Sequence, residues 1–98
     1  MFEEVSAAEA LRRLAGPEPP LLLDVRTEGE FRARHAPGAY LIPLDQLPAR
    51  VGELDAARPT LVVCEHGMRS LVACQFLVAR AGFAHVANVR GGMSAWPL

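Results

Sequence analysis

Short apolar runs alternate with segments of helical pattern along this chain. The runs cover residues 21–25, 39–42, 60–64 and 85–89. Apolar runs without an alternating polar face are typical of strands that are covered on both sides. Residues 6–14, 28–35, 44–54 and 71–81, which lie before and between these runs, are predicted helices. Strands that alternate with helices predict an α/β fold with a mostly parallel sheet and helices on both faces.

Local signals mark where several of these helices begin and end. Ser6 and Glu9 have capping-box spacing, so the first helix is predicted to begin there. Gly82 follows the longest predicted helix at a C-terminal cap position. Gly91-Gly92 predicts a turn before a final short helix.

Residues 61–70 contain the strongest candidate for chemistry. An apolar strand leads to Cys64, a glycine-containing turn follows, and Arg69-Ser70 opens the next helix. In a parallel sheet this position lies at the carboxyl end of a strand, where reactive crevices occur. Backbone N–H groups of the turn and the positive end of the helix both favour thiolate over thiol. Cys64 is therefore predicted to be a reactive nucleophile, with Arg69 as a permanent positive charge suited to an oxyanion.

Composition limits the partners that we expect. The chain has 98 residues, of which 51% are hydrophobic, so one domain over residues 1–98 is predicted. A net charge of −1 without a basic run argues against nucleic acid. The first residues are acidic and no apolar run is long enough to span a membrane, so we expect a cytoplasmic protein. In a reducing compartment, two cysteines favour chemistry or packing over a disulfide.

Three blocks of residues lie in a recognisable order. The first block is Leu23-Asp24-Val25-Arg26-Thr27 with Glu30, Phe31, His35, Pro37-Gly38-Ala39 and Ile42-Pro43-Leu44; the second is Cys64-Glu65-His66-Gly67-Met68-Arg69-Ser70; the third is Gly91-Gly92 with Trp96. In order and register they resemble the signatures of the rhodanese family of sulfurtransferases, over nearly the whole chain. The resemblance implies a single-domain rhodanese with a mostly parallel five-stranded sheet.

The resemblance also implies a reaction. Cys64 would attack the outer sulfur of thiosulfate or of a persulfide donor, hold that sulfur as a covalent persulfide, and pass it to cyanide or to a small or protein thiol. No metal and no other cofactor is implied. Related phosphatases of this fold separate cysteine and arginine by five residues, whereas only four separate Cys64 from Arg69. The shorter loop favours sulfur chemistry over phosphatase or arsenate reductase activity.

The loop residues have separate expected roles. Glu65, His66, Gly67, Met68, Arg69 and Ser70 are predicted to form the substrate- and persulfide-binding loop. Their backbone would surround the terminal sulfur, and Arg69 would orient the donor anion. Gly67 is expected to supply a positive φ and a close backbone approach. Ser70 is either an N-terminal cap or a hydroxyl donor to the cysteine sulfur.

Two polar loop residues bear on the choice of donor. The Glu65 carboxylate would repel an incoming thiosulfate by roughly 0.5–1 kcal/mol, which favours a less charged persulfide donor. His66 is either a solvated loop residue or a partly protonated group that offsets this charge.

Other chemically capable residues have simpler interpretations. Cys74 is expected in the core, with a resolving thiol as the alternative. The residues Asp24, Arg26, Glu30 and His35 are expected to form a structural cluster of ion pairs and hydrogen bonds rather than an acid–base site. The chain has no paired ligand spacing for zinc, and Trp96 is expected to be a packing anchor. The rival functional hypothesis is a sulfur-relay or protein-interaction module with little small-molecule turnover.

Overall fold

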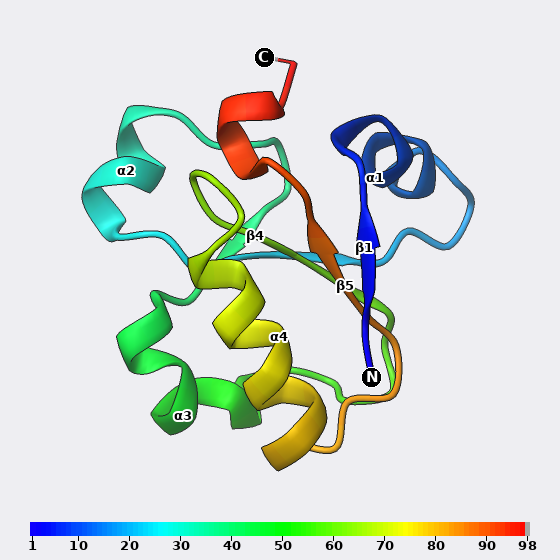
Figure 1. The fold of residues 1–98 in the computed structure, drawn as a ribbon, viewed down its shortest axis with the longest axis vertical. Coiled ribbons are helices and arrows are strands. Elements are labelled where there is room, and N and C mark those ends of the chain that lie inside the picture. Colours follow the sequence, from blue (N-terminus) through cyan, green and yellow to red (C-terminus); the bar gives the residue numbers. More distant parts are fainter. Residues whose placement is uncertain (98) are drawn as a thin grey trace.

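The computed structural model describes residues 1–97 and contains five strands, all of them short. The elements follow in the order β1 (Glu3–Val5), α1 (Ala7–Leu14), β2 (Leu21–Asp24), α2 (Glu28–Ala33), β3 (Tyr40–Leu41), η1 (Leu44–Gln46), α3 (Leu47–Arg50), η2 (Val51–Glu53), β4 (Thr60–Val63), α4 (Arg69–Arg80), β5 (Val86–Val89) and η3 (Gly92–Ala95), where η denotes a 3₁₀ helix. Figure 1 shows this arrangement, with the strands at the centre of the molecule.

The strands form one sheet in the order β1-β5-β4-β2-β3, and every pair of neighbours is parallel. This confirms the predicted α/β class and the five-stranded sheet. The apolar runs had indicated only four strands, because β1 has the sequence Glu-Glu-Val and two of its residues are exposed. It is an edge strand, and Val5 pairs with Val89 of β5. An edge strand of three residues leaves almost no pattern in a sequence.

Alternating side chains divide the core into two layers. Leu22 and Leu61 belong to the layer that contains Ala10 of α1. Their neighbours Leu23 and Val62 belong to the opposite layer, which contains helix α4. Successive side chains of a strand point to opposite faces, so the sheet is covered on both faces as predicted. In Figure 1, α1 and α4 lie on opposite sides of the strands.

Several predicted boundaries needed correction. Residues 44–54 form two 3₁₀ turns around the short helix α3 rather than one helix. Pro48 near the start of α3 lacks an N–H group and Gly52 weakens helical order, which explains the interruption. Helix α2 ends at Ala33 because Arg34 is extended. The strand predicted over residues 39–42 contains only Tyr40–Leu41, and that predicted over 85–89 begins at Val86. Two predicted helix ends are confirmed: Ser6 caps α1, and Gly82 follows α4 with φ +74°.

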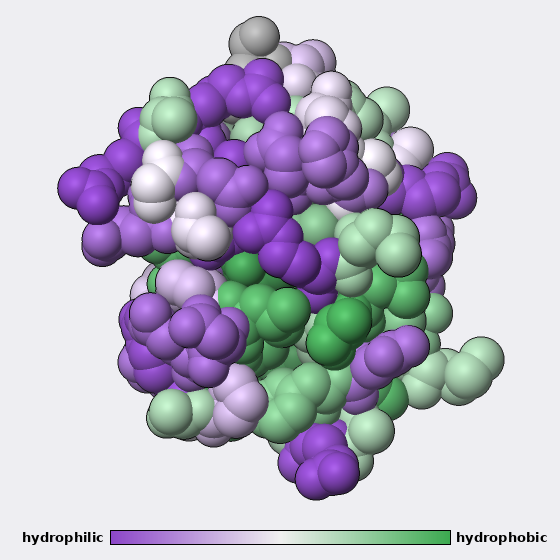
Figure 2. Space-filling view, turned by 60° about the vertical axis from the view of Figure 1, so that its left-hand side comes forward, coloured by the Kyte–Doolittle hydropathy of each residue, from purple (hydrophilic) through white to green (hydrophobic). Residues whose placement is uncertain are grey.

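The surface is unevenly polar. Figure 2 shows hydrophilic residues across the upper part of one face and hydrophobic residues gathered near its middle. Met68 and Val72 are large hydrophobic residues that remain mostly exposed, with 73% and 53% of their surface accessible. Among the helices of residues 1–97, none has the length and apolar character needed to cross a membrane.

Candidate functional site

Cys64 lies directly after β4, at the carboxyl end of the central strand of the sheet. Residues 64–68 form the loop between β4 and α4, which lies between α2 and the red C-terminal turn at the top of Figure 1. Cys64 is only 1% exposed. The strand end therefore presents a buried sulfur at the edge where parallel sheets place their reactive groups.

The loop surrounds the Cys64 sulfur with hydrogen-bond donors. The backbone N–H of Gly67 lies 3.0 Å from Sγ, and the Ser70 Oγ lies 3.2 Å from it. Burial raises the pKa of Cys64, but the hydrogen bonds that its sulfur makes with Ser70 and with the backbone N–H groups of Gly67 and His66 outweigh it. The pKa of Cys64 is therefore below its ordinary value, which increases the thiolate population near neutral pH.

Gly67 has the conformation that was predicted for it. Its φ is +96°, a region that residues with side chains rarely adopt. A Cβ at this position would lie 3.2 Å from the backbone nitrogen of Gly91, so there is little space for one. Glycine thus lets the N–H of residue 67 turn toward the sulfur while the loop packs against the next turn of chain.

The turn after β5 holds the loop from the other side. The backbone N–H of Met93 donates to the Cys64 carbonyl at 2.8 Å, and that of Ser94 donates to the Glu65 carbonyl at 2.9 Å. A Cβ on Gly92 would overlap the backbone of Cys64 and Glu65. Gly91-Gly92 of the third sequence block therefore lets the following backbone approach and hydrogen-bond the loop that carries Cys64. The sequence interpretation did not identify this role.

Ser70 does not cap α4, so that alternative was wrong. The N-cap residue is Met68 without a side-chain hydrogen bond, and Ser70 is the second residue of the helix. Its buried hydroxyl lies between Cys64 Sγ and the side chain of Asn88, to which it donates. Asn88 in turn donates to the Gly67 carbonyl at 3.3 Å. Sequence analysis missed Asn88, although it is the one polar residue in β5.

Arg69 is paired rather than free. Its guanidinium donates to both carboxylate oxygens of Glu30 at 2.7 and 2.9 Å. Glu30 also accepts from Thr27 in the capping box of α2. The Arg69 hydrogen bond, with the Thr27 contacts, lowers the pKa of Glu30 to about 2 despite partial burial. Glu30 therefore stays ionised and offsets the charge that was expected to orient a donor anion.

Glu65 is paired too, with a partner that the sequence analysis did not predict. Its carboxylate lies 3.2 Å from the guanidinium of Arg26. Arg26 is 2% exposed and also binds the fully buried carboxylate of Asp24 at 2.8 Å. Buried charges normally require such partners. Both acidic residues at the loop thus have arginine partners, and His66 is exposed.

The expected structural cluster divides into separate parts. Asp24 and Arg26 form the predicted ion pair, whereas Glu30 joins Arg69 and His35 stacks on Phe31 with a hydrogen bond to its carbonyl. Cys74 and Trp96 are buried in the core as expected. Within residues 1–97, no three potential metal ligands come together.

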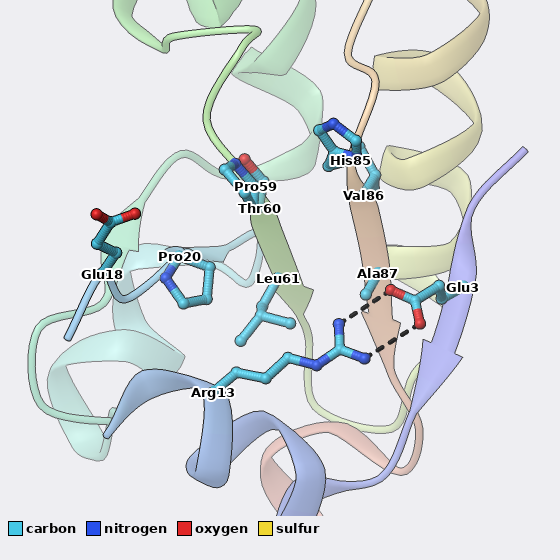
Figure 3. Close-up of a pocket in the computed structure, with 10 residues that line it drawn as sticks. All are labelled: Glu3, Arg13, Glu18, Pro20, Pro59, Thr60, Leu61, His85, Val86 and Ala87. Carbon is cyan, nitrogen blue, oxygen red and sulfur yellow. Dashed lines mark hydrogen bonds and ion pairs between the residues drawn. The ribbon is translucent and has the colours of Figure 1, made fainter. Parts of the chain in front are cut away.

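Two cavities differ in their relation to Cys64. A cavity of about 370 Å³ lies at the amino ends of β4 and β5, at the far end of these strands from the loop. Figure 3 shows its Arg13 already bound to Glu3. A second cavity of about 300 Å³ is lined in part by Arg69 and the apolar side chains of Val25 and Leu44. Of these two cavities, only the second includes a residue next to the loop, namely Arg69 at the start of α4.

Comparison with known proteins agrees with the geometry. The rhodanese-like domain family matches residues 6–97. A sulfurtransferase of Allochromatium vinosum is 35% identical over 98% of this chain and 89% of its own length. The thiosulfate sulfurtransferase GlpE of Shewanella oneidensis is 37% identical over 76% of this chain and 73% of its own. A rhodanese-like domain protein from Staphylococcus aureus superimposes with a TM-score of 0.89, at 30% identity over 98% of this chain and 92% of the other. This chain belongs to the rhodanese family.

Proposed function

We propose that the protein is a sulfurtransferase and that Cys64 is its nucleophile and sulfur carrier. The observation that supports this most is the Gly67 N–H at 3.0 Å from a buried sulfur at the end of β4. Fixed N–H donors aimed at a developing negative charge stabilise it without reorganisation. The similarity to proteins named sulfurtransferase points to the same chemistry.

The reaction proceeds in two displacements. The Cys64 thiolate attacks the outer sulfur of thiosulfate or of a persulfide, the donor's S–S bond breaks, and sulfite or a thiolate leaves with the electron pair. The resulting cysteine persulfide has its negative charge on the terminal sulfur, which the loop backbone of residues 65–70 surrounds. Cyanide or a thiolate then attacks this sulfur and releases the Cys64 thiolate. The second step restores the nucleophile, so no metal or external cofactor is needed.

The paired charges around the loop bear on the donor. Arg69 is paired with Glu30, and Glu65 is paired with Arg26. The surroundings of the loop therefore have no excess positive charge from these four residues. A dianion such as thiosulfate gains less from these paired charges than from free arginines. The preferred donor in this proposal is accordingly a persulfide of lower charge, with thiosulfate as a weaker substrate.

A second candidate is a sulfur-relay or interaction module. Met68 and Val72 are exposed hydrophobic residues one helical turn apart, at the start of α4 beside the loop. Such residues provide apolar contact for a protein partner more than for a small ion. In this alternative, sulfur moves between Cys64 and a protein thiol, while turnover with small donors is negligible.

One comparison of substrates tests the proposal. Thiocyanate formation is measured with thiosulfate and cyanide, and again with a persulfide donor, for the wild type, Cys64→Ser and Cys74→Ala. Sulfur transfer by the wild type and Cys74→Ala, with loss in Cys64→Ser, supports the sulfurtransferase. Transfer to protein thiols alone supports the relay module. Hydrolysis of an aryl phosphate that depends on Cys64, without sulfur transfer, would contradict both.

A further inference from the structure

Four buried groups form a closed ring of hydrogen bonds at the nucleophile. Gly67 N–H donates to Cys64 Sγ at 3.0 Å, and Gly67 C=O accepts from the Asn88 amide nitrogen at 3.3 Å. The amide oxygen of Asn88 accepts from Ser70 Oγ, which lies 3.2 Å from Cys64 Sγ. All four residues are buried. The ring joins the loop after β4 to helix α4 and strand β5.

Donor and acceptor identities determine the direction of this ring. The Gly67 carbonyl can only accept, so the nitrogen of the Asn88 amide must face it and the amide oxygen must face Ser70. That oxygen can also only accept, and the Ser70 hydroxyl therefore gives it its single hydrogen. Ser70 Oγ is left as an acceptor toward the sulfur, which matches the S–H of a thiol.

The thiolate does not fit the same ring. When Cys64 loses its proton, the Ser70 hydroxyl has one hydrogen for two acceptors, the sulfur and the Asn88 oxygen. Donation to the sulfur leaves the buried Asn88 oxygen without its partner. Rotation of the Asn88 amide would restore a donor to Ser70 but would place two oxygens, those of Asn88 and Gly67, face to face. An unpaired buried acceptor is costly in either arrangement.

The geometry points to Asn88 as a positioning residue that holds the hydroxyl hydrogen of Ser70 away from Cys64 and so favours the resting thiol. Asn88 pairs with Val62, two residues before Cys64 on the neighbouring strand, so its side chain is placed beneath the loop. The loop N–H groups thus favour the thiolate and lower the pKa of Cys64. Asn88 limits how far the Ser70 hydroxyl can lower it further. The functional meaning of this balance rests on the proposed role of Cys64 as nucleophile.

Other titratable or charged groups near Cys64 must be held constant in a test. These are Glu65 and His66 in the loop, Arg69 and Cys74 of α4, Glu30 of α2, and Arg26 after β2. None of them is part of the ring, and none is changed in the variants below. A difference in the pKa of Cys64 between these variants therefore reports on the ring.

The test is the pH dependence of Cys64 alkylation by iodoacetamide, followed by the mass of the peptide that contains Cys64. In Asn88→Ala the hydroxyl of Ser70 is free to donate to the thiolate, and a hydrogen bond to a charged group predicts a downward shift of about one pKa unit. Asn88→Leu keeps a branched side chain of similar shape in the core and should shift the profile in the same direction. Circular dichroism verifies the fold of each variant.

A double variant separates positioning from a general structural effect. In a Ser70→Ala background the Asn88→Ala change has no hydroxyl to release, so it should leave the Cys64 profile nearly unchanged. An unchanged or upward shift in the single Asn88 variants would overturn the inference, as would an equal shift with and without Ser70. Alkylation requires no sulfur transfer, so this result stands apart from success or failure of the proposed sulfurtransferase activity.

Discussion

The two cysteines of this protein are equally buried and chemically opposite. Cys64 is 1% exposed and Cys74 is 0% exposed, and both belong to the same hydrophobic layer. The contact with Ser70 and the backbone N–H groups of the loop together outweigh burial at Cys64, so its pKa is lowered. At Cys74 burial dominates, with smaller contributions from Glu4 and Cys64, and raises the pKa to about 12. Reactivity is thus determined by the donors that face the sulfur, and burial alone would make both thiols inert.

The comparison predicts very different alkylation rates for the two thiols. Because the pKa of Cys64 is lowered while that of Cys74 is raised to about 12, the thiolate fraction of Cys64 at pH 8 should exceed that of Cys74 by orders of magnitude. Iodoacetamide should label Cys64 first, as read by peptide mass, and the Cys74→Ala protein should give the same time course. Equal labelling of both cysteines in folded protein would contradict this account.

Moving the loop should make Cys64 resemble Cys74. Gly67→Ala requires a strained φ and places a Cβ 3.2 Å from Gly91, so the N–H at the sulfur should be displaced. Loss of one such donor predicts roughly a 100-fold fall in the rate of sulfur transfer.

Gly29→Ala is the matched control, since a Cβ there meets nothing within 4 Å. It should leave transfer unchanged and stabilise α2 by about 0.5–1 kcal/mol. If Gly67→Ala retained the wild-type rate, the loop donors would not be the source of reactivity.

Cys74 should instead affect stability at alkaline pH. Its folded pKa is raised, so its contribution to stability is complete below the unfolded pKa of about 8.5 and is lost as pH rises toward the folded value of about 12. Within that window it should make the unfolding free energy fall by about 1.4 kcal/mol per pH unit.

Urea unfolding at a series of pH values measures this slope. Cys74→Ala should remove the contribution of Cys74 to this slope. Cys64→Ser should retain that contribution, because the pKa of Cys64 is lowered and its own effect on stability appears at lower pH. An identical slope in the wild type and Cys74→Ala would show that Cys74 ionises as easily folded as unfolded.

The smallest expected effect concerns the charges that distinguish the surroundings of Cys64. Glu30→Gln releases Arg69 from its carboxylate partner, so the KM for thiosulfate should fall by about two- to fivefold at low salt. Glu28→Gln, in the same helix, breaks only the exposed pair with Arg32 and should leave the KM unchanged. A fall of the same size in both variants would indicate a general charge effect, and high salt should reduce the Glu30 effect.

The sequence predicted elements with strong periodicity and missed those that depend on distant contacts. The buried strands β2 and β4 and the long helix α4 left clear apolar patterns. β1 left none, because three residues at an edge gain their order from pairing with β5. The apolar pattern within each segment thus identified the core strands and helices. The edge strand β1 could be recognised only from its pairing in the assembled sheet.

The same division holds at the site. The position of Cys64 and the positive φ of Gly67 follow from local sequence. The partners of Glu65 and Arg69 do not, since each ion pair joins residues 39 positions apart. Asn88 is 18 residues from Ser70, and the two side chains meet only once β5 has paired with β4. The one feature of the sequence that could have identified Asn88 is its amide side chain within the apolar run 85–89. A polar side chain in a buried strand normally has a hydrogen-bond partner.

The central claim is that the loop converts one of two buried cysteines into a sulfur carrier. Intact-protein mass spectrometry under non-reducing conditions, after incubation with a persulfide donor or excess thiosulfate, tests it most directly. The account predicts a gain of one sulfur atom in the wild type and in Cys74→Ala, none in Cys64→Ser, and reversal by cyanide. Absence of the adduct in folded, reduced wild-type protein, or its persistence in Cys64→Ser, would contradict the account.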